Sequence, residues 1–144
     1  MDNIAAVRAR LEQASDLPGI LDAAYEAFEG MLPVIWGQAE RAGGGLAAFV
    51  MAGASAANGR DAVASAPSLP PAAPGHAPLA ASDPATGVTE QEAAAALAGL
   101  SGLLAGRLTD AACWAAGAAD RGACADAAGH AGAIWSLLAG APGR

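Results

Sequence analysis

The stretch DLPGILDAAYEAFEGMLPVIWG, residues 16–37, decides the fold of this chain. It opens with Asp16, a residue type that caps helix N-termini, and Pro18 follows in the first turn, where its missing N–H costs nothing. Placed 100° apart, as in an α-helix, the large apolar side chains fall on one arc about 100° wide. These are Leu17, Leu21, Ala24, Phe28, Met31, Leu32 and Ile35. The stretch therefore predicts an amphipathic helix with one face in a core.

The opposite face of this predicted helix is acidic. Asp22, Glu26 and Glu29 lie within about 40° of one another on the same projection, and we expect them to face solvent. Pro33 falls beside them, on the outer side, where a proline can bend a helix around its core. Di-iron bundles hold their metals with such glutamates and a Glu-x-x-His pair. This chain has no Glu-x-x-His, so we predict no metal site.

Helices are also expected on both sides of this stretch. The first covers residues 2–15, and a third covers residues 46–64 after a glycine triplet. Thr89 and Glu92 form a capping box that opens the longest helix, and a last helix ends before Gly140. No segment has the alternation and the β-branched residues that are typical of a strand.

The sequence SAPSLPPAAPGHAPLAASDPATGV, residues 65–88, contains six of the nine prolines. Proline at this density excludes helix interiors and central strands, so we expect a long extended connection that crosses the bundle. Its PSLP and PAAP motifs also match proline-rich ligands in polyproline II form, but the crossover is the favoured interpretation. The whole chain, residues 1–144, is then a single domain.

The sequence CWAAGAADRGACADAAGH, residues 113–130, is interpreted as the turn of a helical hairpin. Gly117 and the Asp120-Arg121-Gly122 sequence are turn and capping signals, so we expect the helix to break near residues 117–119 and to fold back. The predicted fold is all-α: a five-helix bundle of three helices, a long Pro-rich crossover and a two-helix antiparallel hairpin.

Both cysteines, Cys113 and Cys124, lie in this hairpin, about equally far from the predicted turn. If they face each other, a reversible disulfide is feasible, and a redox-responsive thiol pair is one hypothesis. A zinc site needs about four closely spaced ligands, and the further local candidates are only Asp120, Asp126 and His130. The favoured interpretation is that the cysteines are small buried hydrophobic residues.

The composition limits the function. The chain has 44 alanines and 19 glycines against 14 leucines, so each apolar residue buries little area, at about 25 cal/mol per Å². All seven basic residues are arginine, which together with the alanine and glycine excess indicates a GC-rich bacterial genome. The formal charge is −7 without a basic cluster. Because phosphate neutralisation dominates nucleic-acid affinity, we predict no nucleic-acid partner.

Residues 42–59 contain no charge, and about 18 residues is near the lower limit for a membrane span. Five of them are glycine, and only Leu46, Phe49, Val50 and Met51 are strongly apolar. We therefore expect a buried helix and no membrane insertion. The N-terminus lacks the basic-then-apolar order of a signal peptide, so the expected location is the cytoplasm.

No catalytic constellation is found. The serines have no activating histidine nearby in sequence, and no glycine-rich phosphate loop follows a strand. No carboxylate is expected to hold His130 as a base, so a structural role is predicted for it. We therefore predict that the protein is not an enzyme and has no catalytic residue and no cofactor.

The predicted function is that of a non-catalytic, acidic interaction module, which forms a homodimer or binds another protein. We expect its close helix contacts at small residues with helical spacing, around Gly53 and Ala57 or around Gly99 and Gly106. The sequence favours contacts within one chain and contacts between two chains about equally.

An alternative is a ligand-binding or regulatory bundle. In that case an apolar pocket for a small apolar ligand is expected. Its lining would be the aromatic set Tyr25, Phe28, Trp36 and Trp114.

Overall fold

The computed structural model describes residues 2–41, 45–71 and 89–139. These residues form five helices and no strand. The helices are α1 (Asp2–Gln13), α2 (Leu17–Arg41), α3 (Leu46–Ala64), α4 (Glu90–Trp114) and α5 (Ala118–Ala139). The predicted all-α fold is confirmed. None of the described helices combines the length and the hydropathy that are needed to cross a membrane.

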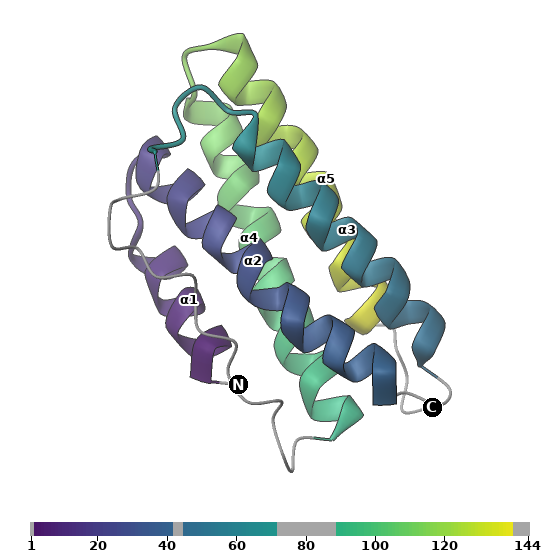
Figure 1. Ribbon diagram of the computed structural model, residues 1–144. Helices are drawn as coiled ribbons and strands as arrows, with labels where there is room; N and C mark the ends of the chain where they lie inside the picture. The colour runs from purple at the N-terminus through teal and green to yellow at the C-terminus, as the bar shows by residue number, and fades with distance from the viewer. Residues whose placement is uncertain (1, 42–44, 72–88, 140–144) are drawn as a thin grey trace.

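Four of the helices form an antiparallel bundle (Figure 1). α2 and α3 make one hairpin, α4 and α5 make the other, and the hairpins pack through α2 against α4 and α3 against α5. α1 lies outside this bundle, along α2 and α4. Because α3 and α4 run in the same direction, the chain between them has to pass from one end of the bundle to the other. This topology requires one long crossover.

Two side chains fix where helices begin. Asp16 accepts a hydrogen bond from the backbone N–H of Gly19 (2.8 Å) at the start of α2. Thr89 accepts one from the backbone N–H of Glu92 (3.1 Å) at the start of α4. Each cap satisfies a donor that has no partner inside the helix. Both N-caps agree with the prediction from the sequence.

The turn between α4 and α5 lies at residues 115–117, slightly earlier than the predicted 117–119. Arg121 explains the difference, since its Nη1 donates to the carbonyl oxygens of Ala115 (3.1 Å) and Ala116 (2.7 Å). Carbonyls at a helix C-terminus have no partner within the helix. Arg121 therefore caps α4 from the first two turns of α5.

The core consists of a few large side chains among many small ones. Its largest fully buried residues are Leu11, Ile20, Leu21, Phe28, Met31, Ile35, Phe49, Leu97, Leu100, Leu104, Leu108 and Ile134. Most come from α2 and α4, and the apolar arc predicted for α2 does face this core. α3 contributes Phe49 and otherwise mainly alanine and glycine.

α3 contacts α2 through two glycines. The Trp36 ring covers Gly53, where an added Cβ would lie 2.6 Å from Trp36 Cη2. Phe28 covers Gly59 in the same way, and an added Cβ there would overlap its ring. Each aromatic ring of α2 thus fills a hollow left by a missing side chain in α3. Aromatic rings bury much more area than alanine does, so these contacts hold the hairpin together.

The acidic side of α2 is not the solvated face that the sequence predicts. α1 packs along α2, Glu26 is buried, and Arg10 of α1 pairs with Glu26 and with Asp22 (3.4 Å). Glu29 pairs with Arg60 of α3 (3.8 Å). The periodicity of α2 does not reveal these pairs, because the cations come from other helices.

Gly59→Ala is expected to destabilise the fold by about 1–3 kcal/mol, because the new methyl group would overlap the buried Phe28 ring. Gly122→Ala is the matched control, since nothing lies within 4 Å of a Cβ added at this exposed position of α5. Alanine there should stabilise the helix by about 0.5–1 kcal/mol. Denaturant unfolding followed by circular dichroism measures both changes. Equal effects of the two substitutions would contradict the packing of the ring on Gly59.

Candidate functional site

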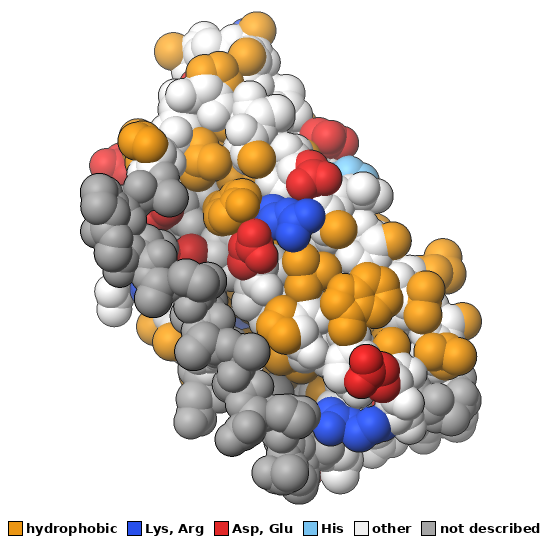
Figure 2. Space-filling view, viewed as in Figure 1, with side chains coloured by type: hydrophobic (Ala, Val, Ile, Leu, Met, Phe, Trp, Pro, Cys, Tyr) orange, Lys and Arg blue, Asp and Glu red, His pale blue; other side chains and the backbone are white. Residues whose placement is uncertain are grey.

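One face of the bundle exposes large apolar side chains over α2 and α3 (Figure 2). Trp36, near the end of α2, is 42% exposed. Three residues of the first turns of α3 are similarly open: Leu46 (46%), Val50 (43%) and Met51 (57%). We call Trp36, Leu46 and Val50 the α2–α3 face, because Met51 lies on another side of α3, about 100° around the helix from Val50. Apolar surface gathered in this way is typical of a contact site.

The glycine packing and the composition of α3 together produce this face. One side of the Trp36 ring rests on Gly53, and the other side is open to water. α3 has no charge from residue 46 to residue 59, so its outer side is apolar as well as its buried side. The exposed apolar side of α3 could have been predicted from the sequence. An uncharged run of about four helical turns contains more apolar residues than one buried face can accommodate.

Charged side chains border the α2–α3 face at both ends. At one end, Arg60 lies between Glu29 (3.8 Å) and Asp61 (3.4 Å). At the other end lie Glu40 and Arg41, the last two residues of α2, which are exposed. Neither of these two forms an ion pair with the part of the chain that the structure describes. The face is therefore an apolar centre between two groups of mixed charge.

Tyr25 lies beside the first of these charged groups, next to Glu29. Burial raises the pKa of the Tyr25 hydroxyl, and its hydrogen bond to the Glu29 carboxylate raises that pKa further. The Tyr25 hydroxyl is therefore next to Glu29, the carboxylate that pairs with Arg60.

The aromatic residues that were predicted to line a pocket lie at different levels of the bundle. Phe28 is fully buried in the contact between α2 and α3, whereas Tyr25 is half-buried. Trp114 is 54% exposed and ends α4, at the opposite end of the bundle from Trp36 (Figure 1). The roles that the structure gives to Tyr25, Phe28 and Trp36 are contacts between α2 and α3.

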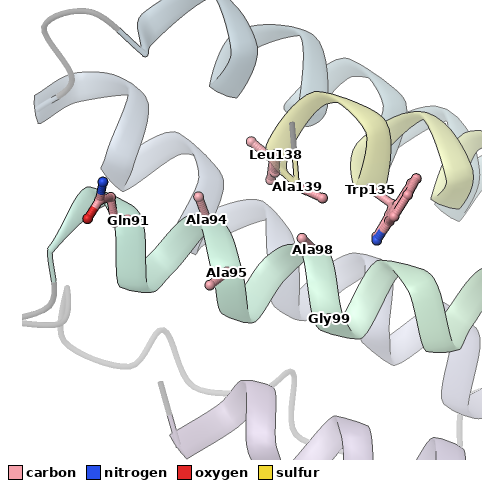
Figure 3. Close-up of a pocket in the computed structure, with 8 residues that line it drawn as sticks. All are labelled: Gln91, Ala94, Ala95, Ala98, Gly99, Trp135, Leu138 and Ala139. Carbon is pink, nitrogen blue, oxygen red and sulfur yellow. The ribbon is translucent and has the colours of Figure 1, made fainter. Parts of the chain in front are cut away.

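A shallow groove of about 500 Å³ lies between the start of α4 and the end of α5 (Figure 3). Its lining is small and apolar except at Gln91, Trp135 and Leu138, and the other lining residues are Ala94, Ala95, Ala98, Gly99 and Ala139. Trp135 packs beside Gly102, where an added Cβ would lie 3.4 Å from Trp135 Cδ1. A large ring again lies over a small residue, and the open side of the indole borders the groove.

Asp120 holds the beginning of the crossover. Its Oδ1 accepts a hydrogen bond from the backbone N–H of Ser68 (3.0 Å), and its Oδ2 accepts one from the Ser68 hydroxyl (2.6 Å). The carboxylate is buried in the first turn of α5, where the helix dipole favours negative charge. Leu69 packs against the core beside this contact. Residues 72–88 of the predicted connection lie outside the described residues.

Cys113 and Cys124 are both free thiols in different surroundings. Cys113 is exposed next to the end of α4, whereas Cys124 is fully buried in α5, ~9 Å along the helix from its first residue. Burial raises the pKa of the Cys124 thiol, and the charge of Asp120 raises it further. The two cysteines are therefore not equally far from the turn, and a disulfide between them requires Cys124 to leave the core.

His130 does have a carboxylate beside it, contrary to the prediction. Its Nε2 lies 3.5 Å from Oδ1 of Asp126, one turn earlier on α5. The i, i+4 spacing that produces this contact was visible in the sequence. In the described ranges, no group of three or more His, Cys, Asp or Glu side chains is placed to hold a metal ion.

Comparison with protein-family models, with curated proteins and with solved structures finds no match for this chain. Its function is therefore inferred from its own surfaces.

Thiol titration of the folded protein is expected to show one fast thiol, Cys113, and one thiol that reacts only on unfolding, Cys124. The raised pKa and the burial of Cys124 both lower its reactivity. At about pH 9 Cys124 should still be protected, because it is buried and its pKa is raised. In Cys113→Ser the fast phase should disappear. Two fast thiols in the native protein would contradict this account and favour the redox hypothesis.

Proposed function

We propose that this protein is a non-catalytic interaction module that associates with itself through the α2–α3 face. The observation that carries the proposal is the exposure of the large apolar side chains of Trp36, Leu46 and Val50, on the side where α2 meets α3. Large apolar patches on soluble proteins mark interaction sites, and tryptophan contributes strongly to binding energy at interfaces. Covering the cluster removes apolar surface from water, at about 25 cal/mol per Å².

The charge distribution supports a second copy of the chain as the partner. The formal charge of −7 makes two copies repel each other when they approach at random. The α2–α3 face carries Arg41 and Arg60, two of the seven basic residues, at its borders. Two copies that meet through this face bring arginines toward carboxylates. A closed two-fold dimer is also the commonest assembly of soluble proteins.

The proposed contact uses large exposed side chains rather than the glycines suggested by the sequence. Gly53 is covered by Trp36 of the same chain, and a Cβ added at Gly99 would lie 3.1 Å from Nη1 of Arg8. Gly106 has open space around it. Close packing of Gly53 therefore occurs within the chain, and the exposed side of α3 remains for the partner.

The proposed setting is the cytoplasm of a bacterium. The support is compositional: all basic residues are arginine, and the two cysteines are free thiols, as is usual in a reducing compartment. The proposal involves no cofactor, no nucleic acid and no membrane.

Light scattering after size-exclusion chromatography is expected to give a mass that approaches twice 13.8 kDa at high protein concentration and falls toward 13.8 kDa on dilution. Val50→Glu places a charge in the apolar centre and should give a monomer with unchanged helicity. Ala5→Glu adds the same charge on the exposed side of α1 and should leave the mass unchanged. A mass of 13.8 kDa at every concentration would contradict the proposal.

A second candidate function is the binding of a small apolar ligand in the groove between α4 and α5. The observation that favours it is the open indole of Trp135 beside a floor of alanines (Figure 3). In ¹⁵N NMR spectra, the indole N–H signal of Trp135 should shift during titration with naphthalene or a medium-chain alcohol. Trp135→Phe identifies the signal, and Trp36 is the internal control. A Trp135 signal that stays fixed with every ligand would exclude this function.

A further inference from the structure

The two charged groups that border the α2–α3 face are placed almost symmetrically about Trp36. Glu29 precedes Trp36 by seven residues on α2, and Arg41 follows it by five. These separations correspond to ~10 Å and ~8 Å along the helix axis. Arg60 is at the level of Glu29, because the two form an ion pair. Trp36 is therefore close to the midpoint between the two groups.

The contact between Trp36 and Gly53 shows which residues of α3 lie at the level of Trp36. Trp36 covers Gly53, and the exposed Ala54 follows directly. The level midway between the two charged groups therefore passes through Trp36 on α2 and through Ala54 on α3. A line through these two residues, perpendicular to the helices, divides the face into two halves of similar length.

Each half contains both acidic and basic side chains, which can pair with those of the other half. In one half, Arg60 is shared by two carboxylates, Glu29 and Asp61, so this half has an excess of negative charge. In the other half, Glu40 and Arg41 have no ionic partner among the described residues. As far as the described residues extend, Arg41 can therefore pair with a carboxylate of a first half, and Glu40 can pair with Arg60.

We propose that two copies of this chain pack face to face about a two-fold axis that passes through the level of Trp36 and Ala54. This inference rests on the self-association proposed above and specifies its geometry. The axis reverses the direction of α2, so Arg41 of each copy faces Glu29 of the other copy. Arg60 of each copy likewise faces Glu40 of the other, and the two Trp36 rings meet at the centre.

The apolar and charged parts of this interface have different roles. The central tryptophans and the first turns of α3 supply the apolar area that leaves water. The four ion pairs at the two ends are near solvent, where screening weakens them, so they select one orientation rather than provide most of the affinity. An approach with parallel α2 helices would place like groups opposite each other. The charges therefore favour the antiparallel arrangement.

The paired substitution Glu40→Arg with Arg41→Glu tests this geometry. It exchanges two neighbouring charges, keeps the net charge and disturbs no ion pair within the described part of the chain. In the proposed dimer it brings the new carboxylate at position 41 toward Glu29 and the new guanidinium at position 40 toward Arg60. We expect the dimer Kd, measured by sedimentation at low salt, to rise about tenfold or more, and the rise to shrink at ~1 M salt as the charges are screened.

The matched control exchanges another pair with unchanged net charge. Arg8→Glu with Glu12→Arg reverses an exposed ion pair on α1, away from the α2–α3 face, and should leave the dimer Kd unchanged. A dimer that tolerates the Glu40 and Arg41 exchange as well as it tolerates this control would overturn the proposed geometry. The two copies would then associate in another relative orientation. A native chain that is monomeric throughout would overturn both proposals.

A crosslink provides a second, independent measurement. Ala54→Cys in a Cys113→Ser background places a thiol near the proposed axis. In the dimer, the thiols at position 54 of the two copies would then lie close together. Mild oxidation should give a disulfide-linked dimer for Ala54→Cys and little for Ala5→Cys on α1. Efficient crosslinking at Ala5 with none at Ala54, in a sample shown to be dimeric, would overturn the two-fold geometry.

Discussion

The close contact between α2 and α3 depends on the absence of side chains at Gly53 and Gly59, and it fixes two of the four helices of the bundle relative to each other. In a chain rich in alanine, most helix contacts bury little area. Here the rings of Trp36 and Phe28 lie over the two glycines and provide the missing area. α2 also packs against α1 and α4, so the helix fixed by these rings positions three neighbours.

The same contact determines the surface on which the proposed function rests. Trp36 is large enough to cover Gly53 and still leave almost half of its surface in water. α3 uses Phe49 and small residues for most of its buried side, whereas Leu46, Val50 and Met51 near its N-terminus are exposed. The acidic stripe of α2 is partly neutralised by Arg10 and Arg60. An apolar centre between mixed charges is the result, and we infer that a second copy covers it.

The sequence predicted the features that depend on local spacing. The five helices, the caps at Asp16 and Thr89 and the buried arc of α2 all follow from residues a few positions apart. It did not predict contacts between distant segments. The burial of Glu26 under α1 and the binding of Ser68 by Asp120 need partners 16 and 52 residues away. Trp36 was identified only as one of the aromatic residues of a hypothetical pocket. Leu46, Val50 and Met51 were expected in a buried helix and are exposed, because periodicity alone does not show which side of α3 the other helices leave open.

We propose that self-association covers Trp36. Its most direct test is the fluorescence of a Trp114→Phe, Trp135→Phe variant, in which Trp36 is the single tryptophan. The account predicts that Trp36 emission shifts to the blue and becomes harder to quench with acrylamide as the protein concentration rises through the dimer Kd. Emission and quenching that remain constant while the sedimenting mass increases would contradict the account, because the copies would then associate through another surface.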